Sequence, residues 1–416
     1  MKFWDFTPPP ESDLGDHDVP LLGHHLVGLR VAMLVTGGIA AMKAPLIARA
    51  LRRQGASVVA FTSDEALRYT TIDTLAWSTN NPVITHLTPA AEHLSDQAPF
   101  DLYLVAPATY NTINKMRYGI ADGVITTTLA SALGRMEQGK TKIMIVPTMH
   151  GSLHNSILTE SLKTLHQMGV AIMPPREDYG KHNLPSEQDL TVEVCRLVTR
   201  SHLRGINILV TGGPTPVLVD SIRRITNRFS GQLGVEITEE LYLRGADVHL
   251  IHGQGNYHPP AYLPHQIIET YDEYLREVIK NLSEKPYQAG IFTAAVADYK
   301  PEEILVGKTP SGGVLKSINL IPTLKVIEVV KDKFPDLSMI TFKYQENVSY
   351  DKLIEIAQER LKKGYSAVVA NRGEEKGIHG EQIAYLVTSN QIPERMIGKK
   401  QIAVKIADYL EQVLRG

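Results

Sequence analysis

Small residues follow the first buried strand at the point where a helix is expected to begin. The strand ends at Thr36, and the next residues are Gly37, Gly38, Ile39 and Ala40. Small residues let backbone N–H groups approach an anion, and the helix dipole favours negative charge, so this turn is typical of a phosphate site. Its spacing is not the GxGxxG of a dinucleotide site, which favours a mononucleotide over NAD. A tight turn that binds no ligand explains the same residues equally well.

A longer polar segment follows the third expected strand. It reads APATYNTINKMRYGIAD over residues 106–122, with Thr126 and Thr127 beyond it. The carboxyl ends of parallel strands meet at one edge of a sheet, and α/β proteins bind ligands in the crevice at that edge. This segment and the turn after Thr36 are therefore expected to face one site.

The segment resembles the homo-oligomeric flavin-containing cysteine decarboxylases, whose pattern is APAT-x-N-T-x-x-K-x-x-x-G-I-A-D-x-x-x-T-T. The resemblance implies FMN as the cofactor, and Ser63, after the second strand, is expected to donate to a phosphate or to the flavin edge. Besides the turn at residues 36–40 and Ser63, the expected cofactor-binding residues are Ala106, Pro107, Ala108, Thr109, Asn111, Lys115, Asp122 and Thr126.

The same resemblance assigns roles to two histidines. His93, nine residues before Leu102, stands where the family has its catalytic base, although a lone histidine is more often structural. The family's asparagine that holds the substrate carboxylate is replaced by His150, which is able to donate the same kind of hydrogen bond. Asn111 is expected to contact the substrate as well. The family's flap cysteine has no counterpart in residues 179–186, and Cys195 lies on an amphipathic helix that predicts core packing.

A similar glycine-containing turn follows an expected strand in the second half of the chain. Residues 211–215 read TGGPT, and residues 223–234 read RRITNRFSGQLG. These segments resemble phosphopantothenate–cysteine ligase, whose pattern is T-x-GPT followed by R-x-ITNRSSG-x-MG. The resemblance makes Asn227 the residue that closes over an acyl-cytidylate, and it places phosphate-binding backbone donors at the helix start. Without the resemblance, the second segment is a polar loop with a helix cap.

The motif AAVADY at residues 294–299 matches the same ligase family. The resemblance assigns Asp298 to the nucleotide ribose or to a metal. It also assigns Lys308 to the charge that develops on the activated carboxylate and phosphate. Strand-end carboxylates and loop lysines are otherwise ordinary solvated charges. The substrate-binding residues expected in this half are Gly213, Pro214, Thr215, Ser230, Gly231, Ala295, Asp298, Lys308, Phe342 and Lys362.

The candidate site residues of both halves lie between apolar segments that predict strands alternating with helices. In the first half, short apolar runs of strand type lie at residues 29–36, 57–62, 102–106 and 143–146. The pattern restarts near residue 205, with further runs at 205–211, 247–252, 289–293 and 367–370. The alternation predicts an α/β fold class with two Rossmann-like domains and mostly parallel sheets. The expected boundaries are a proline-rich arm at 1–27, an FMN-binding domain at 28–203 and a nucleotide-binding, ligase-like domain at 204–416.

Composition limits the other classes of function. The chain has 416 residues, which suits two domains, and its formal net charge of −2 gives no basic surface for nucleic acid or an anionic membrane. No apolar run approaches the ~20 residues that span a bilayer, and no secretory signal is evident. A single cysteine fits a reducing cytoplasm.

Together the two resemblances point to the fused bifunctional enzyme family of coenzyme A biosynthesis. The second domain would activate 4′-phosphopantothenate with CTP, with Mg²⁺ offsetting the triphosphate charge, and cysteine would attack the acyl-cytidylate. The first domain would then decarboxylate the product with FMN. Two alternatives remain open: a paralogue that joins a different acid and amine, and a ligase whose flavin domain is a scaffold. The resemblance also implies a homo-oligomer, with a trimer-based flavin domain and a dimeric ligase domain.

Overall fold

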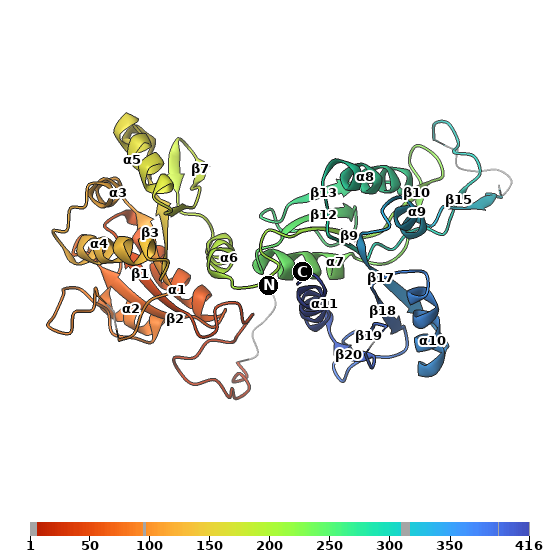
Figure 1. Ribbon diagram of the computed structural model, residues 1–416, viewed down its shortest axis with the longest axis horizontal. Helices are drawn as coiled ribbons and strands as arrows, with labels where there is room; N and C mark the ends of the chain where they lie inside the picture. Colours follow the sequence, from red (N-terminus) through yellow and green to blue (C-terminus); the bar gives the residue numbers. More distant parts are fainter. Residues whose placement is uncertain (1–5, 95–96, 309–316, 390, 416) are drawn as a thin grey trace. The chain divides into compact units, whose positions relative to one another are not determined.

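The computed structural model describes residues 6–94, 97–308, 317–389 and 391–415. The chain forms two compact units, Met1–Thr199 and Arg200–Gly416, each built around its own sheet (Figure 1). The last residues of the expected N-terminal arm belong to the first unit. The backbone N–H groups of Leu22 and Leu26 donate to the carbonyls of Arg53 and Gln54, and Leu26 is fully buried.

The first unit contains a five-stranded parallel sheet whose central strands are almost entirely buried. The apolar strands read as buried runs because helices cover both faces of the sheet. The strand order is β2-β1-β3-β4-β6. In that order the strands are β2 (Ser57–Thr62), β1 (Arg30–Val35), β3 (Leu102–Ala108), β4 (Lys142–Pro147) and β6 (Ala171–Ile172). A small antiparallel sheet lies beyond β4, in the order β5 (Met149–His150), β8 (Lys181–Asn183) and β7 (Arg176–Asp178).

Six α-helices surround the main sheet of the first unit. One group packs together as α1 (Ala44–Arg52), α2 (Ile72–Thr79) and α6 (Glu187–Val198), and the other as α3 (Tyr110–Arg117), α4 (Val124–Glu137) and α5 (Ser156–Gln167). Cys195 is fully buried in α6, as its amphipathic pattern predicts. A 3-10 helix, Ile39–Lys43, follows β1, and α1 begins at Ala44 with a proline in its first turn.

The second unit contains an eight-stranded sheet in the order β13-β12-β9-β14-β17-β18-β19-β20. Six strands are parallel: β13 (His265–Ile268), β12 (Asp247–Gly253), β9 (Asn207–Gly212), β14 (Ala289–Phe292), β17 (Ser338–Gln345) and β18 (Ala367–Arg372). The last two are antiparallel: β19 (Ile383–Val387) and β20 (Glu394–Ile397). The predicted α/β class with mostly parallel sheets is confirmed.

Helices and two small ribbons complete the second unit. The helices are α7 (Gln232–Leu243), α8 (Tyr271–Glu284), α9 (Val326–Lys333), α10 (Tyr350–Leu361) and α11 (Lys399–Val413). The ribbons pair β10 (Val217–Leu218) with β11 (Arg224–Ile225), and β15 (Tyr299–Pro301) with β16 (Leu320–Pro322). Among the described residues of both units, no helix has the length and apolar character needed to cross a membrane.

Both main sheets contain a switch in strand order. In the first unit the chain passes from β1 to β2 on one side and then to β3 on the other. In the second unit β9 is likewise flanked by β12 and β14. Loops leave such neighbouring strands in opposite directions, which opens a crevice at their carboxyl ends. The fold therefore positions one candidate site after β1 and β3, and another after β9 and β14.

Candidate functional site

A cavity of about 1120 Å³ opens at the switch point of the first unit. It is lined by the segments that follow β1, β2, β3 and β4, and by the small sheet. Ligand pockets commonly enclose about 300–1,000 Å³, so this cavity has room for more than one small molecule. The predicted residues that line it are Thr36, Gly37, Gly38, Ile39, Ala40, Ser63, Thr109, Asn111, Lys115, Asp122, Thr126 and His150.

Three predicted cofactor residues support the wall of the cavity without lining it. Ala106, Pro107 and Ala108 belong to the buried strand β3. The Thr36 hydroxyl donates to the Pro107 carbonyl at 2.7 Å and accepts from the Thr109 backbone N–H at 3.2 Å. This pair of bonds joins the turn after β1 to the start of α3. The turn also needs glycine at one point, since a Cβ on Gly37 would lie 2.4 Å from the Glu65 Cβ.

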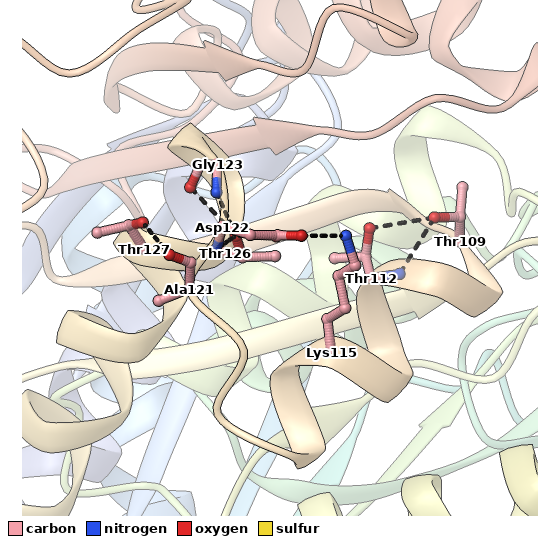
Figure 2. A network of polar contacts seen from close by, with 8 residues as sticks. All are labelled: Thr109, Thr112, Lys115, Ala121, Asp122, Gly123, Thr126 and Thr127. Carbon is pink, nitrogen blue, oxygen red and sulfur yellow. Dashed lines mark hydrogen bonds and ion pairs between the residues drawn. The ribbon is translucent and has the colours of Figure 1, made fainter.

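A polar network joins α3 to the start of α4 at the edge of the cavity (Figure 2). Lys115 Nζ donates to Asp122 Oδ2 at 2.6 Å, and the Thr126 hydroxyl donates to Asp122 Oδ1 at 3.1 Å. The Thr126 oxygen also accepts from the backbone N–H groups of Asp122 and Gly123, at 3.1 and 3.0 Å. The Lys115 ammonium lowers the pKa of the Asp122 carboxyl, so this carboxylate stays ionised at neutral pH.

We expect Thr126→Val to destabilise the first unit by about 1–2 kcal/mol, because two backbone N–H groups at the start of α4 lose their acceptor. Thr127→Val is the matched control, since that hydroxyl donates only one long bond, to the Ala121 carbonyl at 3.3 Å. Trp77 lies on α2 in the first unit, so thermal unfolding followed by tryptophan fluorescence measures the effect. The melting temperature should fall by about 2–8 °C in the first variant. Equal melting temperatures for the two variants would contradict the assigned role.

His93 takes a different position from the other predicted residues. It is not among the described residues that line the cavity, and it is only partly exposed. Its Nδ1 is buried and has no hydrogen-bond partner among the described residues. The loop before it is held by Glu92, whose carboxylate accepts from the Thr88 backbone N–H at 3.0 Å and from the Thr88 hydroxyl. That hydroxyl bond also lowers the pKa of Glu92.

The loop that follows β14 is the centre of the site in the second unit. The backbone N–H of Ala295 donates to the Gly213 carbonyl at 2.9 Å, and that of Ala297 donates to the Thr215 hydroxyl at 3.0 Å. Pro214 forms a parallel bridge to Ala295. Only glycine suits position 213, because its φ is +76° and a Cβ would lie 2.5 Å from the Gly253 carbonyl oxygen.

The polar loop before α7 contacts the loop that follows β14. Asn227 Nδ2 donates to the Ala295 carbonyl at 2.9 Å. Gly231 is the N-cap of α7, and the Ser230 hydroxyl accepts from the Gln232 backbone N–H at 3.4 Å. Asn227 and the turn after β9 thus both contact the loop that follows β14.

Two lysines that were not predicted belong to this site. Lys325 Nζ forms an ion pair with Asp298, and the Thr323 backbone N–H donates to the Asp298 carbonyl at 3.0 Å. Burial, followed by the charge of Arg360, lowers the pKa of Lys343, and Asp298 and Lys325 act on the same lysine. The described residues contain no cluster of three histidine, cysteine or acidic side chains that would hold a metal ion. The assignment of Asp298 to a metal therefore stays a prediction.

The other predicted ligase residues occupy different surroundings. Lys308 is exposed and follows Gly307, whose carbonyl accepts from the Ser221 backbone N–H at 3.4 Å. Phe342 packs partly against the core of the second unit. Lys362 forms an exposed ion pair with Glu359 on α10, at 2.5 Å. No described interaction joins Lys362 to the loop at Asp298.

Comparisons with known proteins match both units of the chain. A family model described as flavoprotein matches residues 22–199, and one described as the DNA/pantothenate metabolism flavoprotein C-terminal domain matches residues 203–414. The coenzyme A biosynthesis bifunctional protein CoaBC of Thermococcus kodakarensis is 33% identical over 398 residues, which are 94% of this chain and 96% of the relative. The chain belongs to the CoaBC family.

Two further matches extend the comparison. The CoaBC protein of Methanocaldococcus jannaschii is 28% identical over 390 residues, which are 93% of this chain and 94% of the relative. The crystal structure of the DNA/pantothenate metabolism flavoprotein from Streptococcus pneumoniae matches half of the chain, with 28% identity and a TM-score of 0.45, and is itself covered completely.

Membership of this family confirms the functional class predicted from the sequence. The protein is a bifunctional enzyme of coenzyme A biosynthesis with a flavoprotein decarboxylase half and a ligase half. The paralogue and scaffold alternatives are not favoured. The chain differs from the resembled decarboxylases at His150, which replaces an asparagine, and in the segment around β7 and β8, which has no flap cysteine. Both positions line the cavity of the flavoprotein half.

Proposed function

We propose that the second unit joins 4′-phosphopantothenate to cysteine at the expense of CTP, and that the first unit decarboxylates the product with FMN. The observation that carries this proposal is the presence of both family motifs at the switch points of two sheets, one beside a cavity of about 1120 Å³. The order of the two reactions follows from chemistry, because the carboxylate that is lost enters with the cysteine.

The residues around the first cavity fit FMN. Backbone N–H groups and hydroxyls of residues 36–40 and Ser63 would hold its phosphate, and Thr109, Asn111 and the Asp122 region would face the rest of the cofactor. FMN, when bound, supplies the reversible oxidation next to the substrate thiol that eases the loss of CO₂. His150 would donate a hydrogen bond to the substrate carboxylate and orient it. Lys115 and Thr126 would keep the Asp122 carboxylate in place.

In the second unit, CTP would bind over the loop at residues 294–298. A free carboxylate is a poor electrophile, so attack by the cysteine amine needs the better leaving group that an acyl-nucleotide provides. Lys325, Lys343 and Lys308 would offset charge on the carboxylate and phosphates, and Asn227 would cover the intermediate. Mg²⁺ would enter with the triphosphate of its substrate, with Asp298 nearby.

Oligomeric state and location are part of the same proposal. A trimer-based flavin domain would allow His93 of one subunit to act beside the cavity of another, which accounts for its absence from the cavity of its own chain. The ligase domain would form dimers. A cytoplasmic location, suggested by the single cysteine, is consistent with these substrates.

The test is mass spectrometry of the products formed from 4′-phosphopantothenate, cysteine, CTP and Mg²⁺ by FMN-loaded enzyme. We expect 4′-phosphopantetheine, CMP, pyrophosphate and CO₂. Accumulation of phosphopantothenoylcysteine alone would limit the proposal to the ligase half. No product from protein that retains FMN would reject the substrate assignment, and replacement of CTP by ATP measures the choice of nucleotide.

A further inference from the structure

One face of the small sheet in the first unit carries basic side chains that the proposed mechanism does not use. In this sheet, β8 pairs with β5 through His150 opposite Lys181, and with β7 through Arg176 opposite Asn183. Residues directly opposite each other, and residues two apart on one strand, share a face. His150, Arg176, Lys181 and Asn183 therefore project from the same face. All four line the cavity.

Neither cation on this face forms an ion pair with a carboxylate among the described residues. The two cations are Arg176 and Lys181, and both side chains are exposed. Asp178 lies opposite Lys181, but it does not line the cavity, and its backbone carbonyl accepts from Asn183 Nδ2 at 3.3 Å. Arg176, Lys181, His150 and Asn183 thus face the same cavity, whose lining also includes the carboxylates of Asp64, Glu65 and Asp122.

Contacts of His182, which also lines the cavity, and of the turn at Gly180 hold this arrangement in place. His182 Nε2 is hydrogen-bonded to His154 Nδ1 at 2.7 Å, and His182 Nδ1 lies 3.6 Å from Glu177 Oε1. The Gly151 backbone N–H donates to the Gly180 carbonyl at 3.0 Å, which fixes the turn between β7 and β8. A fixed face loses less conformational freedom when it binds an anion.

The basic face is separate from the turn expected to hold the FMN phosphate. That turn follows β1, whereas the small sheet begins directly after β4, and β3 lies between β1 and β4. Two strand spacings separate the two starting points by roughly 10 Å. One phosphate is therefore not expected to reach both places, and the cavity has space for a second anion.

We propose that Arg176 and Lys181 form a subsite for the phosphomonoester of the decarboxylase substrate, with Asn183 as a neutral donor. This inference rests on the proposed function, in which the substrate carries a phosphate at the end remote from its cysteine carboxylate. Arginine offers a planar fork and lysine a point charge, and both are common ligands of phosphate. The subsite would make the flavoprotein half select phosphorylated substrates over their unphosphorylated forms.

The test compares phosphopantothenoylcysteine with pantothenoylcysteine as substrates of FMN-loaded enzyme. Arg176→Gln and Lys181→Gln should each raise KM for the phosphorylated substrate by about 10-fold, as expected for the loss of one charge-assisted bond. KM for the unphosphorylated substrate and kcat for both should change less than about 3-fold. Lys163→Gln, an exposed lysine on α5 that does not line the cavity, is the control. Arg176→Lys should restore most of the affinity.

Two further measurements distinguish a wrong assignment of the phosphate subsite from a wrong assignment of the decarboxylase reaction. Calorimetric binding of 4′-phosphopantetheine and pantetheine tests the subsite even if the wild-type enzyme decarboxylates neither substrate. The wild-type protein should prefer the phosphorylated ligand, and the double Gln variant should lose this preference. Equal loss of affinity for both ligands would overturn the inference. Weaker FMN binding in the Gln variants would overturn it as well, because the two cations would then hold the cofactor phosphate.

Discussion

Replacement of His93 by glutamine should lower CO₂ release from phosphopantothenoylcysteine by at least about 100-fold, the usual contribution of a general base. Ligation in the second unit and FMN retention should be unchanged, because His93 lies in the first unit and does not line the cavity of its own chain. His166→Gln, on the exposed side of α5, is the control. The measurement is CO₂ release at saturating substrate, together with bound flavin absorbance.

A mixing experiment tests where His93 acts. Its buried Nδ1 has no described partner, and the loop that carries it is fixed by the bonds between Thr88 and Glu92. If the histidine serves a neighbouring subunit, oligomers assembled from His93→Gln and Asn111→Ala chains contain some sites with neither change. A 1:1 mixture should then recover about one quarter of the wild-type sites. Activity no higher than that of the separate variants would place His93 in the same chain as the cavity that it serves.

Local patterns were sufficient to predict most of the framework. The apolar runs that became β1, β3 and β9 are buried on both faces, so they carry a strong sequence signal. The segment from Thr109 to Thr126 contains its own helix cap and its own ion pair, and its structure depends mainly on neighbours in sequence. The motifs at the ends of these strands were therefore placed together correctly.

Features that depend on distant contacts were not predictable in this way. The strands β5, β7 and β8 have two or three residues each and carry polar side chains, so they lack an alternating apolar pattern. Their pairing alone brings Arg176 and Lys181 to the cavity.

The ion pair between Asp298 and Lys325 is a second example. The two residues are 27 positions apart and lie on either side of the β15–β16 ribbon. The sequence pattern identified Lys308 as the cation of the ligase site, whereas the folded chain places Lys325 directly beside Asp298. The role of Lys308 in charge stabilisation remains a proposal. Substitution of each lysine allows their contributions to the ligase reaction to be compared directly.

Lys325→Gln should lower pyrophosphate release from CTP and 4′-phosphopantothenate by at least about 100-fold, comparable to the loss of one electrostatic contact to a transition state. The change removes a positive charge beside a site that must hold a triphosphate and a carboxylate. It also leaves Asp298 without its partner, so the local potential becomes more negative. Lys363→Gln is the matched control, since Lys363 forms an exposed pair with Glu328 at 2.9 Å.

A double variant separates these two causes. If the unpaired Asp298 is the main obstacle, Asp298→Asn should recover much of the activity of Lys325→Gln. If Lys325 itself stabilises charge in the reaction, the double variant should remain as slow as the single one, because no cation replaces the lysine. Lys308→Gln, measured alongside, shows which lysine contributes more. A Lys325→Gln enzyme within about 3-fold of the wild-type rate would contradict the assignment. Lys325 and Asp298 would then be an ordinary exposed ion pair, which contributes at most about 1 kcal/mol to stability.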